Sequence, residues 1–154
     1  MKTLVEKDIS DLIAAALASL GIEGAQIISP WATVAAGEVR NVESADAGLV
    51  IEVTVGNRLY DSPQQQQARW QCSVSLTVRD GVDPTGCLML GAWADISALL
   101  QSWQDDLDAA VAAFSAASFD LSGFRLDGGP GPQHSGENKC WTVDSSFTVQ
   151  GSVN

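Results

Sequence analysis

The chain is poor in the residues that most often bind metals or perform acid-base and nucleophilic chemistry. It has one histidine, His134, and three cysteines among 154 residues. The cysteines, Cys72, Cys87 and Cys140, are odd in number and show no CxxC spacing. This pattern fits reduced cytosolic thiols better than a disulfide framework, and it lacks the ligand spacing of a zinc site. We therefore expect no metal and no cofactor.

Basic residues are scarce as well. Eight Lys and Arg against 19 Asp and Glu give a formal net charge of -11. Such a charge repels phosphate backbones, so specific nucleic-acid binding is not expected. Only 18% of the residues are charged, below the roughly 25% of ordinary domains. Much of the surface must consist of small or neutral polar residues, which is compatible with burial against copies of the same chain.

Long apolar runs are missing too. No stretch approaches the ~20 apolar residues needed to cross a bilayer, and acidic residues interrupt the apolar part of "MKTLVEKDISDLIAAALASL". We expect a soluble protein made in a cytoplasm, with no membrane partner. The hydrophobic content of 45% with five tryptophans is enough to bury a core, and the length predicts a single domain, 1–154.

The first segment predicts an amphipathic helix. Thr3 and Glu6 have capping-box spacing, apolar residues recur from Ile9 to Leu20 at helical spacing, and Gly21 is a plausible stop. Residues 22–41 are less clear, with two short strands conceivable at 25–34 and 37–42. Pro30 requires that any strand there is an edge strand or ends there.

Three segments alternate apolar and polar residues, as strands with one covered face do: 49–55, 69–79 and 141–150. Between them we expect one long helix from about residues 91–95 to 117. Its apolar stripe comprises Trp93, Ile96, Leu99, Leu100, Trp103, Leu107, Val111 and Phe114. A short apolar piece around Phe124 and Leu126 precedes "DGGPGPQHSGEN", which is expected to be an exposed loop. The order predicts an α+β fold: an antiparallel sheet of about four to five strands, with the N-terminal helix and the long helix packed on one face.

Candidates for chemistry are weak. His134 lies in the glycine-rich loop, where a solvated residue is the simplest interpretation. Asp105, Asp106 and Asp108 diverge around a helix and are expected to be solvated. Cys72 lies on an apolar strand face, whereas Cys140 has the opposite parity to Trp141 and could be more exposed. The glycine-rich loop lacks the Lys and Ser/Thr of a P-loop. We predict that the protein is not an enzyme.

The polar strand faces are the remaining signal, and they are either solvated or buried between identical subunits. The four glutamines before Ala68 are too few for a prion-like tract and predict the tip of a hairpin, open to a neighbouring subunit. The candidate interface residues are Tyr60, Gln64, Gln65, Gln66, Gln67, Arg69, Arg79, Gln133 and His134.

The layout resembles a protein family. An N-terminal amphipathic helix, the strands "LVIEVTV" and "WQCSVSLTVR", the helix "WADISALLQSWQDDLDAAVAAF" and the closing "WTVDSSFTVQGSV" look like the tail terminator or tail completion proteins of long-tailed bacteriophages, or a prophage-derived equivalent. The resemblance implies a virion protein that forms a hexameric ring on the tail tube and joins it to the head. Its implied partners are its own copies, the tail-tube protein and a neck or connector protein, with DNA passing through the ring.

Two alternatives stay open. The first is a small acidic cytosolic protein-binding module, chaperone-like or immunity-like and without catalysis. The second is a ligand-binding domain with a pocket between sheet and long helix, which requires a cavity lined by tryptophans. The simpler expectation is that Trp70, Trp93, Trp103 and Trp141 fill the core.

Overall fold

The described residues form three helices and a six-stranded sheet. The computed structural model describes residues 5–22, 25–28, 49–60, 67–83, 85–115, 119–129 and 131–153. The helices are α1 (Val5–Ala18), α3 (Cys87–Asp105) and α4 (Leu107–Ala113). The strands are β1 (Ala25–Ile28), β2 (Leu49–Val55), β3 (Gln67–Arg79), β4 (Phe119–Gly128), β5 (Gln133–Ser135) and β6 (Cys140–Val153).

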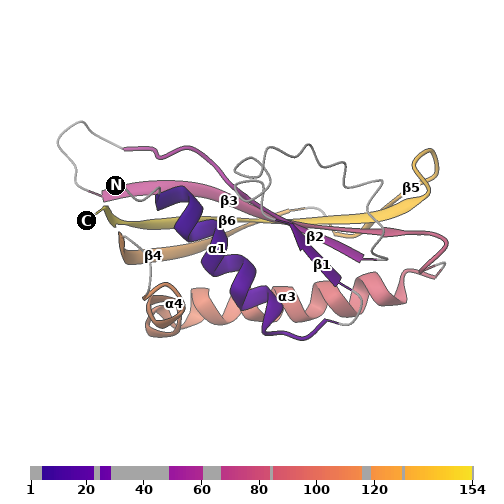
Figure 1. Ribbon diagram of the computed structural model, residues 1–154, viewed down its shortest axis with the longest axis horizontal. Coiled ribbons are helices and arrows are strands. Elements are labelled where there is room, and N and C mark those ends of the chain that lie inside the picture. Colours follow the sequence, from indigo (N-terminus) through magenta and orange to yellow (C-terminus); the bar gives the residue numbers. More distant parts are fainter. Residues whose placement is uncertain are drawn as a thin grey trace.

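The sheet has the strand order β1-β2-β3-β6-β4, and β5 also pairs with β6. The long strands β3 and β6 are antiparallel along their whole length, from Gln67 opposite Ser152 to Arg79 opposite Cys140. They form the long axis of the molecule (Figure 1). Every described pairing is antiparallel except β1 with β2, which is parallel. The sheet is therefore mixed.

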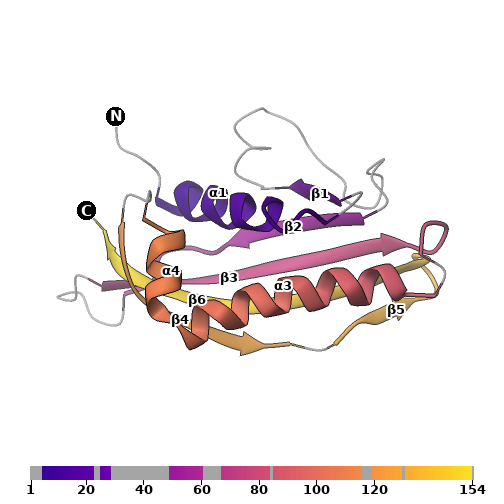
Figure 2. The same cartoon turned by 90° about the horizontal axis from the view of Figure 1, so that it is seen from below.

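All three helices lie on the same side of the sheet (Figure 2). The alternation predicted for β3 is confirmed, because its even-numbered residues from Ala68 to Val78 are buried and its odd-numbered residues are partly or fully exposed. The buried residues of β2 and β6 that face the helices join those of β3 in one core with α1 and α3: Leu49, Ile51, Val53, Val55, Val143, Phe147 and Val149. We call the helix-covered side the core face and the opposite side the polar face.

The strand β4 escaped the sequence analysis because its alternation changes phase. Phe119 and Leu121 are separated by one residue, as are Phe124 and Leu126, but the two pairs have opposite parity. The structure explains this with a register shift between Leu121 and Gly123. A bulge adds one residue to one strand, so both apolar pairs reach the core face. A second shift lies between Leu126 and Gly128.

The predicted single long helix is divided at Asp106. This residue has extended backbone (φ -133, ψ 97), ends α3 and begins α4, and its carboxylate accepts a hydrogen bond from the Asp108 N–H at 3.1 Å. The α4 axis runs across that of α3 (Figures 1 and 2). An extended residue rotates the helical period, so Leu107 and Val111 are 42% and 41% exposed and do not continue the predicted stripe.

The helix α3 also begins earlier than expected. The Asp83 carboxylate accepts hydrogen bonds from the backbone N–H groups of Leu88 (3.2 Å) and Met89 (2.8 Å). These N–H groups in the first turn would otherwise have no partner. The Asp83 cap therefore sets the start of α3 at Cys87, several residues before the first strongly periodic position.

Contacts between aromatic rings pack the helices against the sheet. Trp103 of α3 packs edge-on against Phe114 and Phe124, with ring centroids 5.4 and 5.5 Å apart. Phe119 lies 5.2 Å from Trp70, and Phe124 lies 5.2 Å from Phe147. Trp70 and Trp103 therefore fill the core as predicted, whereas Trp93 and Trp141 are only partly buried.

The α+β class, the N-terminal helix and the later long helix are confirmed. β1 is an edge strand and ends at Ile28, as Pro30 required. The expected strand at 37–42 and the Thr3 half of the capping box lie outside the described residues. Part of the expected exposed loop is β5, a short strand on the edge of β6. Among the described residues, no helix is both long and apolar enough to span a bilayer.

Candidate functional site

The polar face of the sheet carries neutral polar side chains along its central strands. β3 contributes Gln71, Ser73, Ser75 and Thr77, and β6 contributes Thr142, Ser146, Thr148 and Gln150. These residues pair across the two strands, as Gln71 does with Thr148 and Thr77 with Thr142. None of the three described helices covers this side (Figures 1 and 2). The polar face is thus a long surface of hydroxyl and amide groups.

A groove runs along the polar face where β4 adjoins β6. It has a volume of about 490 Å³ and is lined by Gln71, Cys72, Ser73, Arg125, Asp127 and Ser146. The Asp127 carboxylate accepts hydrogen bonds from Thr148 Oγ1 (2.7 Å) and Arg125 Nε (3.0 Å). Asp127 is the extra residue of the second bulge in β4. The bulge therefore places an acid-base pair at the wall of the groove, with the guanidinium of Arg125 largely exposed.

The predicted interface residues do not form one site. Tyr60, Gln67 and Arg69 lie at one end of β3, where Leu59 bridges to Arg69 and Gln67 accepts a hydrogen bond from Gln150 (2.9 Å). At ~3.3 Å per residue, the other end of β3 is about 40 Å away. There Arg79 opposes Cys140, beside Gln133 and His134 of β5. Gln64, Gln65 and Gln66 lie outside the described residues.

The hairpin proposed for the glutamine run is supported by strand pairing. β2 and β3 are antiparallel, with Leu49 opposite Val78 and Val55 opposite Cys72. Residues 56–66 therefore connect two paired strands, as predicted. Gln67 differs from the prediction, because it is the first residue of β3 and not part of the loop.

His134 has defined contacts at the β5 end of the molecule. Its Nε2 lies 2.9 Å from both carboxylate oxygens of Asp80, and its ring centroid lies 4.8 Å from that of Trp141. The register places His134 opposite Trp141. The side chain is 38% exposed. His134 is therefore a strand residue that ties β5 to the end of β3. The expectation that it lies in a loop was wrong, whereas the expectation that it is exposed to solvent is confirmed.

A buried carboxylate lies at the opposite end of the sheet. Glu6 of α1 accepts hydrogen bonds from the Trp70 indole (3.2 Å) and from Arg58 (3.3 and 3.4 Å). Burial raises the pKa of Glu6, but hydrogen bonds from its own backbone, from Trp70 and from Arg58 outweigh this, so the pKa lies below its ordinary value. The charged carboxylate thus joins α1 to β3.

The cysteines offer little nucleophilic chemistry. Burial raises the pKa of the Cys72 thiol to about 12, and the negative charge of Asp127 adds to the shift. A thiol with such a pKa is almost entirely protonated at neutral pH. Cys140 is buried, contrary to the suggestion that it is more exposed, and Cys87 at the start of α3 is exposed.

The acidic cluster at the α3–α4 junction is solvated as predicted, since Asp105, Asp106 and Asp108 are all exposed. Asp105 accepts a hydrogen bond from Gln101 at 2.9 Å. Within the described part of the chain, His, Cys, Asp and Glu side chains nowhere form a group of three or more that could hold a metal ion.

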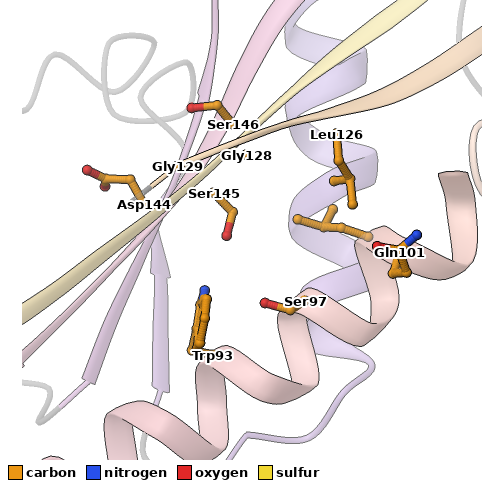
Figure 3. Close-up of a pocket in the computed structure, with 10 residues that line it drawn as sticks. Trp93, Ser97, Gln101, Leu126, Gly128, Gly129, Asp144, Ser145 and Ser146 are labelled. Carbon is orange, nitrogen blue, oxygen red and sulfur yellow. The ribbon is translucent and has the colours of Figure 1, made fainter. Parts of the chain in front are cut away.

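A second cavity lies on the core face, between α3 and the sheet (Figure 3). Its volume is about 170 Å³, and Trp93, Ser97, Leu100 and Gln101 of α3 form one side. The other side is formed by Leu126, Gly128 and Gly129 and by Asp144, Ser145 and Ser146 of β6. The position between sheet and long helix is the one expected for a ligand-binding domain, although only one tryptophan lines it.

The sequence analysis gave a pocket at this position only as an alternative and did not predict its polar lining residues, although one signal was present. Ser145 lies on β6 between Val143 and Phe147 at the parity of the core face. A hydroxyl in an otherwise apolar row marks a position where the packing is not purely hydrophobic. The residues on the helix side carried no such signal, because Trp93 belongs to the predicted apolar stripe.

Comparison with protein-family models gave no match for this chain, and comparison with curated proteins gave none either.

Proposed function

We propose that this protein is a structural, non-catalytic subunit of a phage or prophage tail, a tail terminator that caps the tail tube and joins it to the head as a hexameric ring. The observation that supports this best is the polar face of β3 and β6. A large sheet surface made mainly of hydroxyl and amide groups, which none of the described helices covers, suits contacts with another protein, because such groups form hydrogen bonds across an interface.

The element order adds support. An amphipathic helix, paired strands, a long helix and closing strands form the pattern on which the resemblance to tail terminators rests. In a ring, each subunit presents one surface to the preceding copy and a different surface to the next. The polar face is the candidate for one of these two surfaces.

The test is a matched pair of arginine substitutions. Gln71 is exposed on the polar face and lines its groove, whereas Ala98 is exposed on α3. Gln71→Arg is expected to block assembly, and Ala98→Arg to leave it intact. Light scattering after size exclusion measures the assembly of the 16.2 kDa chain, alone and with purified tail tubes of the phage whose genome carries the gene.

A ring that Gln71→Arg disrupts and Ala98→Arg preserves supports the proposal, as does binding of the chain to tube ends. A chain that stays monomeric at all concentrations and does not bind tubes overturns it. Circular dichroism of both variants ensures that a loss of assembly is not a loss of folding.

The acidic protein-binding module is the second candidate, and the exposed surface of α4 favours it. Leu107 and Val111 are exposed next to Asp106 and Asp108, which combines apolar contact area with negative charge. A monomer that binds a basic partner, with affinity that falls as salt rises, would favour this candidate. Asp108→Asn together with Val111→Ser should weaken such binding, while Gln71→Arg should not.

A further inference from the structure

The cavity between α3 and β6 lies at a notch in the sheet edge. β4 pairs with β6 up to Gly128 opposite Ser146, and β5 resumes the pairing at Gln133 opposite Thr142. Between these points the edge of β6 has no regular partner strand among the described residues. Gly129 approaches it closely, since a Cβ there would lie 2.9 Å from the Asp144 carbonyl oxygen. Gly128 and Gly129 line the cavity beside this break in the pairing.

Three hydrogen-bonding groups converge on this cavity. The indole nitrogen of Trp93 and the hydroxyls of Ser97 and Ser145 point into the space between α3 and β6 (Figure 3). Within the described part of the chain, none of these three groups has a hydrogen-bond partner. None of the three is among the buried unpaired polar atoms of the described residues, so each is accessible. Their convergence from two elements makes them available for hydrogen bonds to a molecule that enters the cavity.

The charge of the cavity restricts what can enter. Asp144 is its only ionisable lining residue, and its carboxylate points away from Trp93 and Ser97 (Figure 3). Leu100 and Leu126 supply apolar walls. A charged ligand would lose its hydration here without gaining a counter-charge. The cavity thus favours a neutral molecule.

Size and shape restrict it further. A cavity of about 150 Å³ with apolar walls holds a molecule as large as benzene, and this one has about 170 Å³. The indole of Trp93 offers a flat partner for a second ring. We infer that the cavity is a binding site for a small neutral ring compound that carries a hydroxyl group, packed against Trp93 and Leu126 and hydrogen-bonded to the Trp93 N–H, Ser97 and Ser145.

Phenol is the probe for this site, with benzoate and benzylammonium as charged compounds of similar size. Ligand-observed NMR titration of the full chain should show saturable binding of phenol and at least tenfold weaker binding of both charged compounds. Trp93→Phe keeps the ring but removes the N–H group, and should weaken phenol binding roughly fivefold, the effect of one neutral hydrogen bond. Ser145→Leu fills the cavity and should abolish binding.

The matched control is Ser75→Leu on the neighbouring strand β3, because Ser75 lies on the polar face and does not line the cavity. It should bind phenol as the unchanged chain does. Thermal unfolding of each variant separates loss of the site from loss of the fold, and Ser145→Ala, expected to weaken binding a few-fold, replaces Ser145→Leu if the latter unfolds.

Absence of saturable phenol binding, equal binding of the charged compounds, or equal effects of Ser145→Leu and Ser75→Leu in folded chains would each overturn the inference. The inference is independent of the ring proposal, since the cavity lies on the core face and the proposed contact surface is the polar face.

Discussion

At the start of α1, the Glu6 carboxylate accepts a hydrogen bond from the Trp70 indole, a residue 64 positions away. Arg58, whose Cζ lies 6.0 Å from the centroid of the Trp70 ring, completes the group. The relative exposure of Glu6 is 8%, so its charge is stabilised by these partners and only weakly by water. One residue thus connects the first helix, the segment after β2 and the core strand β3.

Glu6→Gln should lower stability at neutral pH by about 2 kcal/mol, because hydrogen bonds to a charged group are lost. The folded-state pKa of Glu6 lies below its ordinary value of 4.5, so the folded state binds fewer protons than the unfolded state as this group titrates. The contribution of Glu6 is therefore fully present above pH 4.5 and is lost as the pH falls through the folded-state pKa. Urea unfolding of the original chain and of the Glu6→Gln variant from pH 7 to pH 3 measures this contribution to stability.

The difference in free energy of unfolding between the original chain and the Glu6→Gln variant should become smaller as the pH falls. Asp11→Asn is the control, since Asp11 pairs with Lys7 on the exposed side of the same helix and should have a smaller effect. A pH-independent difference for Glu6→Gln would contradict this assignment.

At the scale of elements, β4 is held against β6 by close backbone contact. A Cβ at Gly151 would clash with the Asp120 carbonyl oxygen and lie 2.6 Å from Phe119 Cδ2. Gly151→Ala should force β4 away from β6 and cost about 1–3 kcal/mol, as overpacking does. Chemical denaturation measures the loss, and hydrogen exchange should show weaker protection of β4 than of β3.

Gly91→Ala is the matched control in α3. Gly91 is exposed and has no atoms within 4 Å of a Cβ, and alanine favours a helix interior by about 1 kcal/mol over glycine. This substitution should raise stability. If both substitutions changed stability in the same direction, the close packing of β4 on β6 would be in doubt.

At the scale of the whole molecule, the net charge of -11 bears on the proposed passage of DNA. An acidic ring would repel the genome and let it slide through the lumen. A gel-shift assay with a short DNA duplex in about 50 mM salt, where electrostatic binding is strong, should show no complex. Retention of the duplex at this salt concentration would contradict the charge argument. Poly-lysine, which binds the duplex through its positive charge, is the positive control.

Local patterns were enough to predict much of this fold. The alternation in 49–55, 69–79 and 141–150 identified three strands and their buried faces, because a strand with one covered face must repeat every two residues. The helical spacing from Ile9 to Leu20 identified α1. These patterns also led to the α+β class, because they indicated one covered side on every strand.

Other features depend on contacts between distant residues. The bulge at Ser122 that lets Phe119, Leu121, Phe124 and Leu126 face the same core is set by pairing with β6. No proline or glycine at Asp106 indicates that the helix is interrupted there. The helix that follows, α4, is held in place by the contact of Phe114 with Trp103. A local sequence pattern around Ser122 or Asp106 includes neither β6 nor Trp103, so it cannot predict the bulge or the helix break.

The sequence by itself determined the composition of each surface: which strand faces are apolar, how acidic the chain is and how few reactive side chains it carries. These properties follow from residue type and local period. Only the tertiary structure decided which residues meet. It separated the predicted interface residues to the two ends of β3, and it brought Ser145 above Trp93 and Ser97, because pairing register and helix placement are set by contacts across the whole chain.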